Sequence, residues 1–200
     1  TGLEGTITGA AELTAGENLV LDSADLSGGT VSAVAAQGLS ARGAALNATK
    51  GTLTLKAEAA DIDASGATLT AKDEVKLTAK QSITATEASV EADSLTMTAD
   101  TGSVGATGFT ATVADQVSVV AGDTVVLDNA ELAAGALTAT ASLGDLSVKD
   151  AVITATKDGV TLTAEAADID ASSAKLTVKD ELTLTAQQSI TATGEWHLNN

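Results

Sequence analysis

The sequence predicts an all-β fold, a right-handed parallel β-helix (β-solenoid) of about nine coils, each with three short strands and roughly 21 residues. Three observations support this prediction. Aliphatic residues recur about every 21 positions, and a long segment of the chain is present twice. Aromatic residues make up only 1% of the chain and proline is absent. Self-similarity with a period of 20 to 50 residues is typical of stacked repeat architectures.

The long repeat is a tandem duplication. Residues 54–86 and 161–193 lie 107 positions apart and are identical at 26 of 33 positions. The similarity extends upstream, where LVLDSADL at 19–26 matches VVLDNAEL at 125–132. We therefore expect residues 1–200 to form a single rod with duplicated blocks at roughly 19–89 and 125–196. We interpret residues 194–200 as a candidate C-terminal cap.

Three series of aliphatic residues define three strands in each coil. The first consists of apolar pairs two residues apart: Leu53/Leu55, Val75/Leu77, Leu95/Met97, Val117/Val119, Leu137/Ala139, Val160/Leu162 and Leu182/Leu184. The second is Leu19, Leu39, Ile62, Ile83, Val104, Val125, Leu146, Ile169 and Ile190. The third is Leu26, Leu46, Leu69, Val90, Val113, Leu132, Ile153, Leu176 and Leu198. Because polar residues alternate with the apolar ones, each segment has the period of two of a strand with one buried face.

The composition fits a narrow core and a soluble surface. Ala, Val, Leu and Ile supply most of the 44% apolar content, with one Phe and one Trp. Proline cannot donate to a hydrogen-bond ladder, so its absence fits sheets that are paired along their whole length. Nine coils spaced ~4.8 Å apart would make a rod roughly 43 Å long.

The formal net charge is −17, from 27 acidic and 10 basic residues. Such a surface disfavours nucleic acid, which proteins bind mainly by neutralising phosphates. No apolar stretch approaches the ~18 residues of a membrane span. We therefore expect neither nucleic-acid binding nor membrane insertion.

The coil pattern resembles the haemagglutination-activity repeats of filamentous haemagglutinin-like exoproteins, including the stalks of contact-dependent inhibition effectors. The resemblance depends on residues 19–33 (LVLDSADLSGGTVSA), on residues 125–141 (VVLDNAELAAGALTATA) and on recurring strands such as LTLTA at 182–186. It covers nearly the whole chain, but no N-terminal secretion domain is recognisable. It implies a right-handed β-helix, two-partner secretion to the bacterial cell surface, and a structural or adhesin role.

The sequence does not predict an enzyme or a cofactor. His197 is the only histidine and there is no cysteine, so no second such residue completes a zinc site or a nucleophilic constellation. We interpret His197 and the adjacent Trp196 as part of the C-terminal segment. Polysaccharide-degrading β-helices are the enzymatic alternative, but the single arginine, Arg42, and two aromatic residues offer little for such a cleft.

Acidic residues provide the candidate metal ligands. Two Asp-Ile-Asp motifs, Asp61/Asp63 and Asp168/Asp170, place paired carboxylates on the outward face of a strand. Carboxylate oxygens are ligands that Ca²⁺ prefers. However, the pairs are five coils apart, and one coil later each pair is replaced by Ser and Thr. We therefore interpret them as solvated surface residues and as weak metal candidates. A corner column of Asp73, Asp93, Asp115, Asp158 and Asp180, next to Lys50, Lys72, Lys157 and Lys179, is a second weak cation candidate.

Outward threonines on the first strand series suggest another alternative. Four of the seven outward pairs from 54 to 185 are Thr-Thr, an arrangement that can order water in ice-binding solenoids, whereas Lys56 and Lys76 interrupt the array. Thr also favours exposed strand positions for ordinary reasons.

The sequence thus predicts a structural stalk or adhesive fibre segment of a secreted bacterial surface exoprotein. Its partners would be cell-surface molecules or other rods stacked end to end. The alternatives are a glycan- or cation-binding module, the less favoured ice-binding array, and an engineered repeat scaffold.

Overall fold

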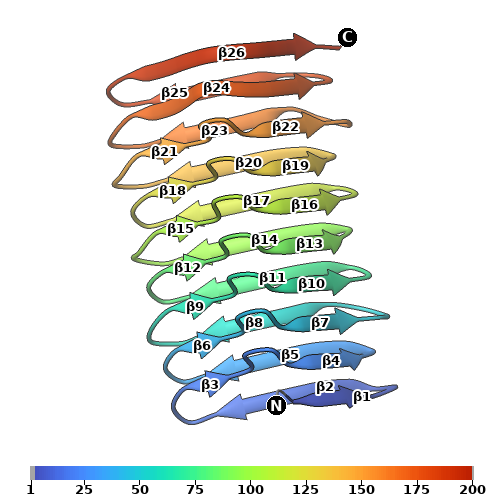
Figure 1. Cartoon of the computed structure of the whole chain (residues 1–200). Helices are drawn as coiled ribbons and strands as arrows, with labels where there is room; N and C mark the ends of the chain where they lie inside the picture. The colour runs from blue at the N-terminus through green and yellow to red at the C-terminus, as the bar shows by residue number, and fades with distance from the viewer. Residues whose placement is uncertain (1–2, 200) are drawn as a thin grey trace.

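The computed structural model describes residues 3–199, and within this range every regular element is a β-strand. Successive strands turn around a common axis and stack coil on coil into a rod, with the N-terminus and C-terminus at opposite ends (Figure 1). All strand pairings between coils are parallel. The predicted β-solenoid of about nine coils is confirmed.

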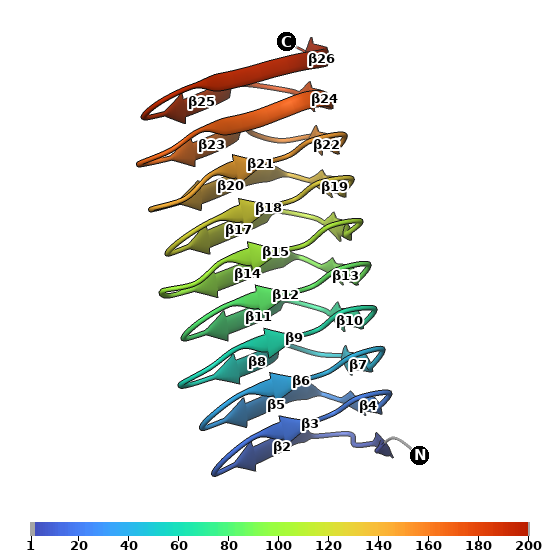
Figure 2. The ribbon, with the colours of Figure 1, turned by 60° about the vertical axis from the view of Figure 1, so that its left-hand side comes forward.

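Each coil contributes one strand to each of three faces, which are visible together in Figure 2. Face 1 is a nine-stranded sheet: β2 (Ala10–Ala15), β5 (Thr30–Ala35), β8 (Leu53–Ala57), β11 (Glu74–Ala79), β14 (Ser94–Ala99), β17 (Gln116–Ala121), β20 (Ala136–Ala141), β23 (Val160–Ala164) and β25 (Leu182–Ala186). Face 2 contains two-residue strands: β3 (Leu19–Val20), β6 (Leu39–Ser40), β9 (Ile62–Asp63), β12 (Ile83–Thr84), β15 (Val104–Gly105), β18 (Val125–Val126) and β21 (Leu146–Ser147).

Face 3 follows a short turn after face 2. Its strands are β1 (Glu4–Thr6), β4 (Asp25–Gly28), β7 (Ala45–Ala48), β10 (Thr68–Ala71), β13 (Ser89–Ala92), β16 (Thr110–Val113), β19 (Glu131–Ala134) and β22 (Val152–Ala155). In the last two coils, β24 (Ile169–Val178) and β26 (Ile190–Leu198) run through the corner and contribute to both faces. These two strands join faces 2 and 3 into one 17-stranded sheet.

The register confirms the first two aliphatic series. On face 1, Leu53 pairs with Val75, and the same column continues to Leu182 at the last coil. On face 2, the column from Leu19 to Ile190 contains the nine predicted residues. The side chains of Leu53, Ile62 and Ile83 are completely buried. Each aliphatic residue therefore stacks on its counterparts in the coils above and below.

The third series is wrong at two positions. Val90 pairs with Ala111, so Val113 lies two residues further along the strand, where it pairs with Ala92. In the last coil Leu176 pairs with Trp196, whereas Leu198 pairs with Val178. An error of two residues keeps a side chain on the same face of a strand, and Val113 is accordingly buried, whereas Leu198 in the last coil is 60% exposed. At the expected position one coil has the smaller residue Ala111 and the other has the larger residue Trp196, so neither fits the aliphatic pattern.

Phe109 explains the substitution at Ala111. Phe109 is 1% exposed and occupies a core column that is alanine in the neighbouring coils, at Ala88 and Ala130. We infer that the aromatic ring fills space in this layer that Val90 and Leu132 fill in the neighbouring layers. The smaller Ala then fits at position 111. The volume of the layer is conserved by exchanging a large and a small side chain, as close packing requires.

A turn with a left-handed residue separates faces 2 and 3 in the coils that contain β3 to β21, and in β24 the corresponding residue lies within the strand. The amide of Ala24 donates to the carbonyl of Leu21, which closes a four-residue turn whose third residue, Ser23, has a φ of 55°. The equivalent residues in later coils also have positive φ: Gly43, Gly66, Glu87, Gly108, Asn129, Asp150 and Ser173. Gly and Asn tolerate this conformation best, which accounts for much of the composition of the column.

Candidate functional site

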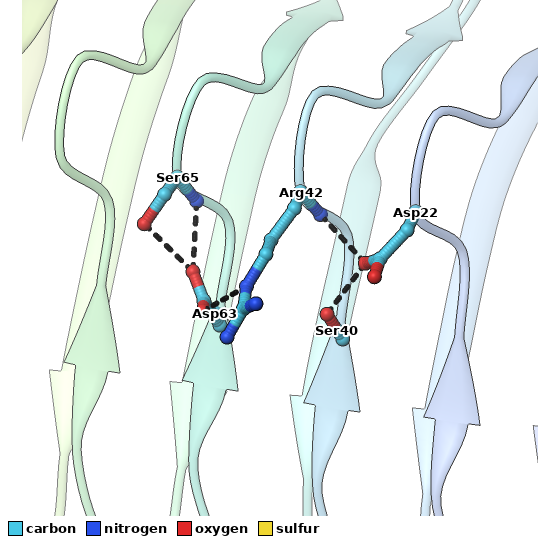
Figure 3. A network of polar contacts seen from close by, with 5 residues as sticks. All are labelled: Asp22, Ser40, Arg42, Asp63 and Ser65. Atoms are coloured by element: carbon cyan, nitrogen blue, oxygen red, sulfur yellow. Dashed lines mark hydrogen bonds and ion pairs between the residues drawn. The ribbon is translucent and has the colours of Figure 1, made fainter.

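The most organised polar region lies on face 2 and at the turn that follows it. Figure 3 shows five residues from three successive coils joined there by hydrogen bonds and one ion pair. Oδ1 of Asp22 accepts hydrogen bonds from Oγ of Ser40 at 2.5 Å and from the amide of Arg42 at 3.0 Å. Nε of Arg42 reaches Oδ2 of Asp63 in the next coil at 2.5 Å. The network therefore links consecutive coils through side chains.

Asp63 is the most constrained carboxylate of this network. Its Oδ1 accepts from the hydroxyl of Ser65 at 2.7 Å and from the Ser65 amide at 3.1 Å. Partial burial of Asp63 acts to raise its pKa, but the Ser65 bonds and the charge of Arg42 outweigh burial and hold the pKa of Asp63 below its usual range. Its partner Arg42 has a raised pKa because it donates to Asp63 and is attracted by its charge.

The duplication repeats this arrangement five coils further along the rod. Oδ1 of Asp128 accepts from Ser147 Oγ at 2.5 Å and from the amide of Lys149 at 2.9 Å. Asp170 accepts from the hydroxyl and the amide of Ser172, and these bonds lower the pKa of Asp170. Lys149 takes the position of Arg42, and its charge also lowers the pKa of Asp170, but by less than the bonds to Ser172 do. The second copy thus keeps the hydrogen bonds of Asp128 and of Asp170, but among the described residues no hydrogen bond or ion pair joins Lys149 to Asp170 as Arg42 joins Asp63 in the first copy.

A column of short polar side chains precedes face 2 and supplements the backbone ladder. Oδ1 of Asp61 accepts the amide of Ser82, one coil later, at 2.7 Å, and Oδ1 of Asp168 accepts the amide of Ser189 at 2.7 Å. Four more steps of the column are Asn18 to Gly38, Ser82 to Ser103, Ser103 to Thr124, and Asp145 to Asp168. Each side chain satisfies a backbone amide that otherwise depends on water. This column was missed in the sequence, because Asn, Asp and Ser there look like ordinary turn residues.

These contacts define what the four metal candidates do. Asp61 and Asp168 bond the backbone of the next coil, and Asp63 and Asp170 bond the serine two residues later in their own turn. Within residues 3–199, no group of three or more His, Cys, Asp or Glu side chains is placed to hold a metal ion. The geometry assigns all four carboxylates to hydrogen bonds within the rod.

Two open grooves on face 2 coincide with the duplicated networks. The larger has a volume of about 580 Å³ and is lined by residues that include Ser40, Arg42, Asp61 and Asp63. The smaller, of about 330 Å³, contains their counterparts Ser147, Asp168 and Asp170, together with Asp145. Arg42 offsets part of the negative charge of the first groove, whereas Asp145 adds negative charge to the second. The grooves are open and have mixed polar and apolar linings, and the aromatic residues Phe109 and Trp196 do not line them.

The predicted acidic corner column also forms, at the start of face 1. Asp93 and Asp115 stack one coil apart, and Gly135 takes the next position, where an added Cβ would lie 2.3 Å from the Asp115 carbonyl oxygen. Lys157 extends across Gly135 and places its Nζ 2.5 Å from Oδ1 of Asp115, two coils away. The hydrogen bond and charge of Asp115 raise the pKa of Lys157. This exposed ion pair offsets part of the repulsion along the column.

The remaining candidates lie on face 1 and at the C-terminal end. The outward threonine pairs of face 1 stand in register, as the sequence predicts. His197 is exposed on β26 and pairs with Thr177. Trp196 lies over the buried Leu176 but remains 38% exposed. The structure places His197 apart from both grooves.

Comparison with known proteins did not identify a relative: no protein-family model, curated protein or solved structure matches the chain. The resemblance to haemagglutinin-like repeats therefore stays a prediction that depends on the residues quoted above. Among residues 3–199 the search for a helix long and apolar enough to cross a membrane found none.

Proposed function

We propose that the protein is a structural rod, a stalk or adhesive fibre segment of a secreted bacterial surface protein. The observation that supports this most strongly is the continuity of the core. One cluster of buried hydrophobic residues, aliphatic apart from Phe109 and Met97, extends from Ala11 to Val178 through the stacked coils, and no polar or charged residue of the described chain is buried with it. A uniform core of this kind gives every coil similar neighbours and no single weak layer.

Polar contacts between coils support the same proposal. The side-chain column beginning at Asn18 and the duplicated Asp-Ser networks add hydrogen bonds along the rod axis, in the same direction as the backbone ladders. Within residues 3–199, no buried side-chain nitrogen or oxygen lacks a hydrogen-bond partner. The conserved elements of the two blocks are therefore ones that hold coils together, which suits a spacer.

The location and the size of the natural polypeptide test this proposal. Antibodies against the 200-residue rod should label intact bacteria of the source strain, and protease added outside the cells should remove the signal. The reacting polypeptide should have an intact mass well above the 19.5 kDa of this chain. A signal confined to the cytoplasm and resistant to external protease would contradict the proposal.

A glycan-binding module is a second candidate, favoured by the recurrence of an open groove at equivalent positions of the two blocks. The Nε of Arg42 donates to Asp63, which leaves the other two guanidinium nitrogens as hydrogen-bond donors in the first groove. Binding of the protein to an array of bacterial and host glycans, reduced by Arg42→Ala, would support this candidate. An array without any signal above background would contradict it.

A further inference from the structure

Face 1 changes character along the rod. Its two central outward columns contain charged residues only in the first four coils, at Glu12, Lys56 and Lys76. From β14 to β25 the same columns are uncharged, and we call these ten positions the threonine face: Thr96, Thr98, Ser118, Val120, Thr138, Thr140, Thr161, Thr163, Thr183 and Thr185. Lys56 and Lys76, which interrupt the threonine array in the sequence, therefore both lie N-terminal to the threonine face.

The threonine face is regular in two directions. Its five strands pair in parallel without a register shift, and Figure 2 shows them as nearly parallel arrows stacked one above another. Strands in such a sheet lie roughly 4.8 Å apart, and residues two positions apart along a strand are roughly 6.6 Å apart. Hydroxyl and methyl groups thus repeat on a rectangular grid whose dimensions are close to the spacings of water oxygens on planes of ice.

The first four strands of the grid are held rigidly from below. Their inward residues, among them Leu95, Val119 and Leu162, are at most 1% exposed, whereas those of β25 are partly buried. Threonine is β-branched, so its side chain has few rotamers, and Val120 keeps the methyl group where the hydroxyl is missing. A surface ordered before binding loses little conformational entropy when it meets an ordered partner.

Most hydroxyls of the threonine face are available to water. Among residues 3–199, only two of them donate to protein side chains: Thr96 to Glu74 at 2.7 Å and Thr183 to Glu181 at 3.2 Å. Both acceptors lie at the border of the face. An uncharged grid of hydroxyl and methyl groups matches the uncharged surface of ice, whereas a nucleic acid or an acidic glycan would require cationic side chains.

We propose that the threonine face binds ice. Its hydroxyls would hydrogen-bond to water molecules at lattice positions, and its methyl groups would hold those waters in place. The proposal is independent of the stalk function: a rod that does not bind ice could still be a stalk, and the reverse also holds.

Growth of single ice crystals in the presence of the purified 200-residue chain tests the proposal. At millimolar concentration we expect faceted crystals and a measurable gap between the melting and freezing temperatures. Thr140→Lys and Thr161→Lys, near the centre of the threonine face, should each reduce this gap at least tenfold. Thr14→Lys and Ser32→Lys are matched controls, because they lie in the same two columns outside the face, and both should retain the wild-type gap.

The variants should fold, since lysine already occupies these columns at Lys56 and Lys76. Unchanged thermal melting of each variant would verify this, and Thr163→Lys replaces Thr140→Lys if that variant melts early. Rounded crystals with no temperature gap for the wild type would overturn the proposal. So would a wild-type gap in both central lysine variants.

Discussion

At the scale of single residues, one core layer exchanges a small and a large side chain relative to its neighbours. Phe109 and Ala111 together replace the combination of a small and a large residue found in the neighbouring coils, Ala88/Val90 and Ala130/Leu132. The sequence could not reveal this exchange. A phenylalanine flanked by Gly and Thr gives no sign of lying in an alanine column, and Val113 offered a larger aliphatic residue two positions later.

Phe109→Ala should therefore destabilise the protein by ~3–5 kcal/mol, the usual cost of removing a buried aromatic ring and leaving a cavity. The double variant Phe109→Ala with Ala111→Leu should recover most of this loss, because it restores the pattern of the neighbouring coils. Urea denaturation of the three proteins measures both effects. A double variant no more stable than Phe109→Ala would contradict the volume exchange.

The hydrogen-bonded carboxylates make stability depend on pH. The pKa values of Asp63 and Asp170 are lowered in the folded protein, so their contribution is present above the pKa of about 3.9 that an unfolded aspartate has, and is lost as pH falls below it. We expect the free energy of unfolding to decrease as the pH is lowered from about 5 to about 2, a range that includes the pKa of an unfolded aspartate. The double variant Ser65→Ala with Ser172→Ala should show a shallower fall. Equal slopes for both proteins would argue against this role of the serines.

At the scale of single strands, the alternation of apolar and polar residues was sufficient to predict orientation and most of the register. The first two series were correct because most of their aliphatic residues have polar neighbours, so a shift by one residue would bury residues such as Thr or Asp. The side-chain column that bonds backbone amides of the next coil could not be predicted in this way. Its members, among them Asn18, Asp61 and Ser82, differ in type from coil to coil and share only an acceptor oxygen.

Ile83 gives the sharpest test of a face 2 strand. It is completely buried and stacks between Ile62 and Val104. Ile83→Asp would place an unpaired charge in the core, and we expect it to lower the melting temperature strongly and to unfold the adjacent coils. Thr84→Asp is the matched control, because Thr84 points outward and is exposed. Unchanged melting of Ile83→Asp would mean that this strand has the opposite orientation.

At the scale of the whole molecule, the last coil protects the core beneath it. Trp196 and Leu198 lie over Leu176 and Val178, which are at most 1% exposed, while they themselves are 38% and 60% exposed. Deleting residues 195–200 should uncover Leu176 and Val178 together with an unpaired strand edge, and promote aggregation. Light scattering against protein concentration measures this, with His197→Ala as a control that keeps the strand. A truncated protein that stays monomeric at high concentration would show that this segment is not a cap.

The sequence predicted the architecture of the rod better than its sites, for a physical reason. Stacking repeats the same packing problem in every coil, so nine examples of the pattern reinforce one another, whereas the polar contacts are made by different residue types from coil to coil. Asp61/Asp63 were predicted to face outward, and they do, but the bonds that they make to Ser82 and Arg42 depend on the relative height of adjacent coils. That height is a property of the folded rod and not of any local motif.

Single-molecule stretching between handles at the two ends tests most directly whether the molecule is a load-bearing rod of stacked coils. Because a coil of about 21 residues extends to roughly 70 Å, we expect a series of force peaks separated by about that length or by multiples of it. Extension of the whole chain without force peaks would show that the stacked coils do not bear load.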